Sequence, residues 1–164
     1  GSDFTIKREF SKKFNSSLAL NYLWSNNLDN NGKLINQPPV RIENNLNFKI
    51  DSFWKVDFSE ISISPSYTFH QFQAPMTITP ENLINGTASI TSESDIFDFK
   101  DAPEGYFLLD FSWKININDF GFSLIVKNLL NEKYRNYLNE MRYFADEPGR
   151  NFIINLSYNF KKKN

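Results

Sequence analysis

Apolar and polar residues alternate along most of this chain with a period of two, the pattern of β-strands with one apolar and one polar face. In the last such segment every second position is apolar: Phe152, Ile154, Leu156, Tyr158 and Phe160. The same alternation runs through 107–117 and 120–126, with a tight connection at 118–119 between them. These segments predict three consecutive antiparallel strands, the first two of which form a hairpin.

Four more strands are predicted in the N-terminal half, at 4–10, 18–24, 42–50 and 54–69. The first has a weaker pattern, because Arg8 occupies an apolar position. The fourth changes phase near Ser59 and Glu60, and we expect a β-bulge there. Pro65 weakens the same strand, since proline cannot donate a hydrogen bond to a neighbouring strand.

The connections between the seven predicted strands alternate in length. Short turns fall near 11–13, 51–53 and 118–119, and long connections cover 25–39, 71–104 and 129–149. Strands of about ten residues can cross a bilayer when they are tilted, and outer-membrane barrels have short periplasmic turns and long extracellular loops. The sequence therefore predicts an all-β fold, an antiparallel transmembrane β-barrel segment of about seven strands.

Composition supports a membrane-facing sheet. The chain has a mean hydropathy of −0.48 and 16% aromatic residues. It has no apolar run of the roughly 18 residues that a membrane-spanning helix needs. Six aromatic residues lie by the short turns: Phe10, Phe14, Phe53, Trp54, Phe120 and Phe160. Six others lie toward the long connections: Tyr22, Trp24, Tyr67, Phe69, Tyr106 and Tyr134. Two such groups are typical of the aromatic belts at membrane interfaces.

Charge and cysteine content narrow the function classes. A net charge of −1 gives no basic surface for nucleic acid, and we expect no nucleic-acid partner. The basic tail at 161–164 is interpreted as a solvated terminus. The absence of cysteine excludes disulfides and cysteine-based metal or catalytic sites. Gly1-Ser2 is typical of a cloning remnant, so we expect the natural N-terminus to lie further upstream.

The segment from Val126 to Tyr134 carries the pattern Asn-Leu-Leu-Asn-Glu-Lys-Tyr, and a Pro-Gly-Arg turn at 148–150 leads into a last strand that ends in an aromatic residue. As a set, these features resemble the C-terminal end of TonB-dependent receptors, the outer-membrane transporters. The preceding segment 105–110 also resembles a strand of that family. The closing resemblance covers about 35 residues.

The resemblance implies a large barrel of which residues 1–160 are the C-terminal part, a plug inside it and a segment that engages TonB. It further implies import of a scarce nutrient such as an iron–siderophore complex, haem or cobalamin. Membrane lipid, the TonB complex and the barrel assembly machinery are the implied partners, and the bacterial outer membrane is the implied location. The residues after Phe160 depart from the family pattern, in which a terminal aromatic residue closes the chain.

The residues of the closing motif also have a local physical interpretation. Asn128 and Asn131 are suited to bond nearby backbone where a strand gives way to a loop. We expect Arg150 to be a charge at a strand end, held by Asp146 or Glu147.

Ligand contacts in a transporter come from the rims and long loops. Our candidates are His70, Gln73, Arg142 and Tyr143, chosen by position. Arg142 could bind an anion with two parallel hydrogen bonds, and Tyr143 could stack and donate. His70 is the only histidine and makes a poor metal site by itself. The acidic loop 71–104 does not have the spacing of a known calcium loop, and we interpret it as solvated.

We find no catalytic motif and expect no enzyme activity, no resident cofactor and no metal site. The alternative is a self-contained small barrel or sandwich that binds an apolar ligand inside. The two hypotheses place the same rings differently. These rings face lipid in a transporter and line an interior in the alternative: Phe107, Phe111, Trp113, Phe122, Phe152 and Phe160.

Overall fold

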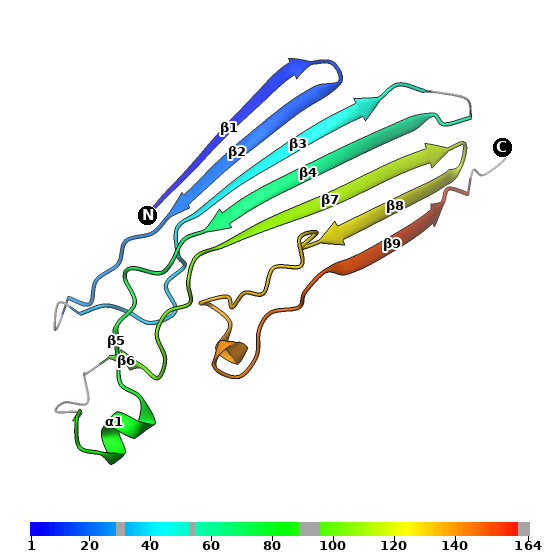
Figure 1. Cartoon of the computed structure of the whole chain (residues 1–164). Helices are drawn as coiled ribbons and strands as arrows, with labels where there is room; N and C mark the ends of the chain where they lie inside the picture. Colours follow the sequence, from blue (N-terminus) through cyan, green and yellow to red (C-terminus); the bar gives the residue numbers. More distant parts are fainter. Residues whose placement is uncertain (29–31, 53–54, 89–95, 161–164) are drawn as a thin grey trace.

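The computed structural model describes residues 1–28, 32–52, 55–88 and 96–160. Seven long strands form one antiparallel sheet, in which each strand pairs with the next long strand along the chain (Figure 1). The strands are β1 (Ser2–Ser11), β2 (Phe14–Tyr22), β3 (Arg41–Ile50), β4 (Phe58–Thr68), β7 (Tyr106–Ile117), β8 (Phe120–Lys127) and β9 (Asn151–Tyr158). This confirms the predicted all-β, antiparallel class. The sheet is open, with β1 and β9 at its two edges.

The strand registers collect the apolar residues on one face. Ile61 lies opposite Trp113, and Ile63 opposite Phe111. The other face is polar, and its side chains bond across strands. Asn47 donates to Asn15 at 2.9 Å and accepts from Ser62 at 2.6 Å. The period of two in the sequence thus becomes one apolar and one polar surface of a single layer.

The apolar face has no second layer over it within the described residues, where each long strand contacts only its hydrogen-bonded neighbours. Phe152 is 63% exposed and Leu156 is 79% exposed. The six diagnostic rings therefore do not line an enclosed interior in the described part of the chain. These rings therefore remain uncovered by the described residues, and the transporter hypothesis has lipid cover them.

The predicted bulge at Ser59 and Glu60 is wrong. Both residues pair without a register shift, with Ile50 and Lys49 on one side and with β7 on the other. The strand begins at Phe58, and this apolar side chain lies on the polar face, opposite Asn116. The apparent change of phase in the sequence therefore comes from Phe58 and not from an extra residue in the strand. The register shift that is present lies between Glu9 and Ser11, at the turn from β1 to β2.

Pro65 lies inside β4 and pairs with Leu109 of β7. On the side of β3 the ladder is interrupted, since the pairing passes from Leu46↔Ile63 directly to Glu43↔Ser66. Proline has no N–H to donate, and the gap in the ladder at this position is the direct consequence. The strand continues because its other edge remains paired.

The connections have the predicted asymmetry. Short turns join the strands at one end, and all long connections leave from the other end, where Figure 1 also shows the N-terminus. The Lys13 ammonium pairs with Asp51 between two of the short turns. The long end carries a two-stranded parallel pair, β5 (Met76–Thr77) and β6 (Phe97–Asp98), the helix α1 (Pro80–Ile84) and the 3-10 helix η1 (Glu140–Tyr143). Of the helices described, none has the length and apolarity to cross a membrane.

The aromatic groups match the prediction in part. At the short-turn end Phe14 stacks on Phe10 and Phe48, with ring centroids 4.9 and 4.6 Å apart. Tyr106 differs from the prediction, because it falls in the polar phase of β7 and packs on Tyr134. These two rings therefore belong to the polar side and not to a lipid-facing belt. Phe53 and Trp54 lie outside the described residues, as does the basic tail.

Candidate functional site

The long connections contain most of the buried polar side chains of the described chain. We call the described parts of 23–40, 69–105 and 128–150 the outer-loop assembly. Its buried polar members are Gln71, Gln73, Asp98, Asn128 and Arg142. Because burying an unpaired polar group is costly, the partners of these residues show how the loops are held together.

An ion pair between two loops lies at the centre of the assembly. Arg142 of η1 pairs with Asp98 of β6, and each side chain is no more than 3% exposed. The Tyr143 hydroxyl donates to Asp98 at 2.6 Å, and the Arg142 guanidinium lies over the rings of Tyr137 and Tyr143. A paired and hydrogen-bonded charge is the form in which a buried ion is tolerated.

The protonation of this cluster follows from its contacts. Burial by itself would raise the pKa of Asp98, but hydrogen bonds from Tyr143 and Arg142 and the charge of Arg142 lower it below its ordinary value. Burial and the hydrogen bond to Asp98 raise the pKa of Tyr143 to about 12. The carboxylate is therefore charged and the phenol neutral across the physiological range.

Two glutamines of the 69–105 connection bind the 23–40 connection to the rest of the outer-loop assembly. Gln71 donates from Nε2 to the Gln37 carbonyl at 2.7 Å. Gln73 donates to the Leu23 carbonyl at 2.8 Å and accepts from the Ser25 amide at 3.3 Å. Gln73 is 2% exposed, so its side chain is fully used in connecting 69–105 with 23–40.

His70 lies at the base of the assembly. Its Nδ1 donates to the Pro103 carbonyl at 2.9 Å, which ties the two ends of the 69–105 connection together. A Cβ atom on Gly105 would come within 2.8 Å of the Tyr67 hydroxyl and 3.0 Å of the Thr68 carbonyl. The close approach of the chain here therefore depends on glycine.

The two asparagines of the closing motif bond local backbone, as predicted. Asn128 has a φ of 50°, its Nδ2 donates to the Glu132 carbonyl at 2.9 Å, and its Oδ1 accepts from the Glu132 amide at 2.9 Å. Asn131 has a φ of 58° and accepts from the Arg150 amide at 2.9 Å. Asparagine tolerates this left-handed backbone, so the motif fixes both the exit from β8 and the entry to β9.

The prediction that Asp146 or Glu147 holds Arg150 is wrong. Asp146 pairs instead with Arg135 at 2.7 Å, and Glu147 accepts from Asn139 at 2.5 Å. Arg135 also donates to the Arg142 carbonyl at 2.8 Å. Arg135 therefore makes the carboxylate contact that was expected of Arg150, because it reaches both Asp146 and the Arg142 carbonyl from within the loop.

A polar pocket of about 290 Å³ opens between the bases of two long connections. We call it the mouth pocket. Tyr106 and Tyr134 form one wall, with ring centroids 4.3 Å apart, and Glu132, Lys133 and Arg135 contribute charges around them. Burial and nearby negative groups raise the pKa of Tyr134, so its phenol remains a neutral donor. Stacked phenols beside charged groups can hold a planar or hydroxylated solute.

All four predicted contact residues have partners within the loops or at their bases. Arg142 and Tyr143 lie together in the buried cluster, and Gln73 and His70 connect loop segments. The structure does not test contact with a ligand, which stays a prediction. Asp98 was missed as a partner because 44 residues separate it from Arg142. The mouth pocket was missed because Tyr106 was expected in an aromatic belt at a membrane interface.

The acidic loop is only partly as interpreted. Asp98 is buried, whereas Asp101 accepts from Thr77 at 2.5 Å in an exposed position. Glu93 and Asp95 lie outside the described residues. In the described ranges no three His, Asp or Glu side chains are grouped closely enough to hold a metal ion.

Comparison with known proteins places the fold. No family model matches this chain, and no match was found among curated proteins. Among solved structures, the copper transporter OprC matches with a TM-score of 0.73 and 15% sequence identity, over 96% of this chain and 22% of that chain. At this identity the similarity shows the fold alone. The chain thus has the fold of a β-sheet segment found in a transporter whose own chain is several times longer.

Proposed function

We propose that this chain forms part of the wall and outer loops of a β-barrel transporter in the bacterial outer membrane. The carrying observation is the single sheet with an uncovered apolar face and a polar face bonded across strands. Lipid covers the apolar face in this proposal, and the polar face lines the interior of the barrel. An open sheet cannot remain in a bilayer, so further strands must pair with β1 and β9.

The proposed system is active and depends on TonB. Residues 1–160 supply the C-terminal part of a receptor barrel, and 161–164 form its basic tail. Other parts of the full-length protein engage the TonB complex, and the barrel assembly machinery inserts the sheet. The similarity to 22% of a copper transporter's chain supports the division into one segment of a larger barrel.

The cargo in this proposal is a scarce small-molecule nutrient, and the chain itself has no enzymatic role. Iron–siderophore complexes, haem and cobalamin are the classes that the sequence resemblance suggests, and copper is the class that the structural relative suggests. We further propose that His70, Gln73, Arg142 and Tyr143 act on cargo at the outer end. Arg142 and Gln73 would do so mainly by holding the loops that surround the mouth pocket.

Fractionation and uptake test the proposal together. An antibody to the 140–149 loop should detect a band several times heavier than 19.2 kDa in the outer-membrane fraction. Uptake of labelled iron–siderophore, haem, cobalamin and copper is then compared in cells with and without the gene. We expect one cargo to lose its energy-dependent uptake. A soluble band near 19.2 kDa would contradict the proposal.

Substitutions in the mouth pocket test whether the cargo binds there. Replacing Tyr134 with Ala removes one of the two rings of the aromatic wall, and we expect weaker cargo binding by about tenfold, since a stacked ring contributes on the order of 1 kcal/mol. Phe144 is the matched control, because it is 80% exposed on the same loop. Equal losses in Tyr134→Ala and Phe144→Ala would exclude the pocket as the specific site.

A further inference from the structure

A small hollow lies on the polar face of the sheet at the short-turn end, far along the strands from the mouth pocket. It has a volume of about 200 Å³ and is formed by three neighbouring strands. Phe122 and two cross-strand rows line it: Asn116, Gly121 and Ser157 in one row, and Lys114, Ser123 and Asn155 in the other. We call this hollow the inner notch.

Gly121 creates the hollow. A Cβ atom at this position would lie 2.4 Å from Ser157 Oγ and 3.3 Å from Asn116 Oδ1. Any side chain would therefore fill the space between the neighbouring strands. The five other residues of the two rows all carry polar side chains.

The polar groups of the inner notch differ from those elsewhere on this face. Nearer the long loops, Lys127 pairs with Asp110 at 2.7 Å, and Arg41 pairs with Glu43 at 2.8 Å. Within the described chain, by contrast, the side chains of Lys114, Asn116, Ser123 and Asn155 make no hydrogen bond or ion pair with protein. The notch therefore has donors available for a bound molecule.

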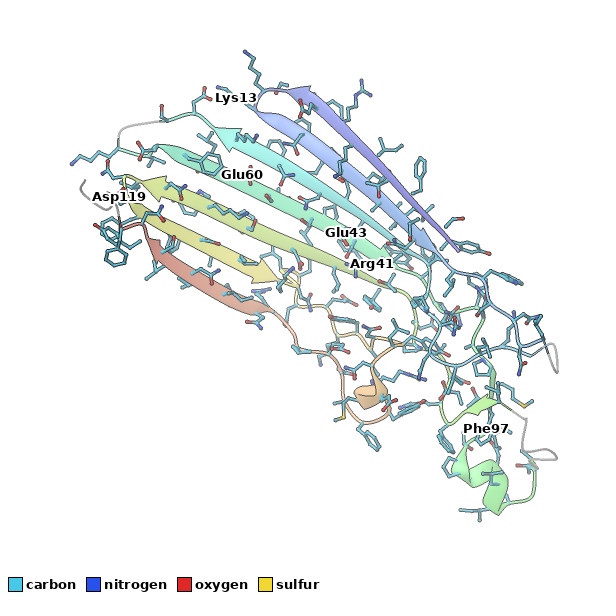
Figure 2. All side chains as sticks on the ribbon, turned by 180° about the vertical axis from the view of Figure 1, so that it is seen from behind. Lys13, Arg41, Glu43, Glu60, Phe97 and Asp119 are labelled. Carbon is cyan, nitrogen blue, oxygen red and sulfur yellow. The ribbon has the colours of Figure 1, made fainter. Side chains whose placement is uncertain are left out.

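Lys114 is the charged residue among those that line the notch. Glu60 lies opposite Lys114 in the register and also opposite Lys49, but no ion pair forms between these described side chains. Figure 2 shows Glu60 along the strands from Arg41 and Glu43, toward the end that carries Lys13 and Asp119. Two ammonium groups thus flank one carboxylate in this row. Asp57 is engaged by the Asn118 amide at 2.5 Å.

We propose that the inner notch binds an oxyanion, the carboxylate or phosphate group of a small solute, on the interior side of the barrel. The inference rests on the proposed function. The Lys114 ammonium supplies the charge, and the amides of Asn116 and Asn155 supply hydrogen bonds. Charge-assisted hydrogen bonds of this kind are stronger than neutral ones. A solute that enters at the mouth pocket would meet this second site before it leaves the barrel.

A cysteine reporter in the full-length protein tests the notch, because this chain contains no cysteine of its own. Ser123→Cys is introduced with any cysteine elsewhere removed, and outer-membrane vesicles react with methanethiosulfonates that carry a sulfonate or a trimethylammonium group. We expect Lys114→Gln to lower the ratio of the sulfonate rate to the trimethylammonium rate about fivefold. Inorganic phosphate and acetate should slow the sulfonate reagent in a saturable manner.

The remaining outcomes separate the sources of the anion and the two proposals. If a carboxylate of another part of the protein fills the notch, neither reagent will react readily and phosphate will have no effect, which overturns the solute site.

Gly121→Ala should abolish phosphate protection while Ser123→Cys remains reactive. Leu124→Cys, on the apolar face, should be unreactive. If it reacts as fast as Ser123→Cys, the membrane barrel itself is wrong. If Ser123→Cys reacts but shows no preference for the sulfonate reagent, the result contradicts the oxyanion site and leaves the membrane barrel unaffected.

Discussion

The sheet and the outer-loop assembly are held together in opposite ways. In the sheet, large apolar side chains such as Phe152 and Leu156 are exposed, and backbone pairing joins the strands. In the loops, polar side chains such as Arg142, Asp98 and Gln73 are buried and bond to one another or to backbone. The difference agrees with the two surroundings of the proposed function, in which lipid covers the apolar face of the sheet and the loops in water must supply their own interior.

This contrast has a consequence for stability. A soluble sheet exposes few large rings, because their burial supplies most of the favourable free energy of folding. Here that burial must come from outside the described chain, whereas the loops depend on a few polar contacts. Damage to the loops should therefore leave the sheet intact, and damage to the apolar face should prevent assembly of the whole.

The largest expected effect is on the buried ion pair. Asp98→Ala leaves the Arg142 guanidinium buried and unpaired, which should cost about 3–5 kcal/mol of local loop stability. Hydrogen exchange should show lost protection across 69–105 and 128–150, with β7, β8 and β9 unchanged. Asp101→Ala is the control, since its carboxylate is exposed. Loss of protection in the strands as well would show that loops and sheet are one cooperative unit.

The next effect is on the apolar face. Phe111→Arg places a charge near the middle of β7 on the lipid side and should cost about 2–4 kcal/mol in a bilayer. Ser112→Arg places the same charge one residue along, on the polar face, and should cost little. Denaturant unfolding of the full-length protein in lipid vesicles measures both. Equal costs would mean that the two faces have the same surroundings.

A smaller effect follows from pH. The lowered pKa of Asp98 stabilises the loops above its ordinary value, and this contribution is lost as pH falls through the lowered value. The raised pKa of Tyr143, about 12, stabilises the loops below its ordinary value of 10.0, and this contribution is lost as pH rises toward about 12. Limited proteolysis should therefore find the loops protected between about pH 4 and 10. Asp98→Asn should remove the acid-side transition, and loop opening near pH 6 would contradict the assignment.

The smallest effect is at the closing motif. Asn128→Ala removes two hydrogen bonds to Glu132 and leaves alanine in a left-handed conformation, which should cost about 1–2 kcal/mol. Asn128→Gly removes the same hydrogen bonds but relieves the backbone, so it should cost less. Thermal unfolding of the two variants separates the contributions. Equal losses would show that the side-chain bonds alone matter.

The sheet was largely predictable from sequence because the alternation of apolar and polar residues depends only on positions close together in the chain. A period of two fixed the face of Phe111 and Leu156 without knowledge of their partners, and the lengths of the connections fixed the two ends. Phase errors arose where the pattern is ambiguous, as at Phe58, an apolar residue in the polar phase at a strand start. Tyr106 was assigned to the wrong group for the same reason, since a ring at a strand end is compatible with either face.

The loops were not predictable in the same way. Asp98 and Arg142 meet only because β6 and η1 fold against each other, and nothing near either residue marks the partner. The capped helix α1 could have been found from Thr79-Pro80, because a threonine before proline is a helix-start signal. The inner notch depends on Gly121 lying between Asn116 and Ser157, which follows from register and not from composition.

The measurement that tests the central claim most directly is a nitroxide scan of β7 in the full-length protein, in outer-membrane vesicles, from 107 to 116. Collision with oxygen reports lipid, and collision with a water-soluble nickel chelate reports water. We predict a strict alternation, with oxygen dominant at Phe107, Leu109, Phe111, Trp113 and Ile115 and the chelate dominant at the positions between them. Chelate access at both sets, or oxygen and chelate excluded from the apolar set, would contradict a lipid-facing barrel wall.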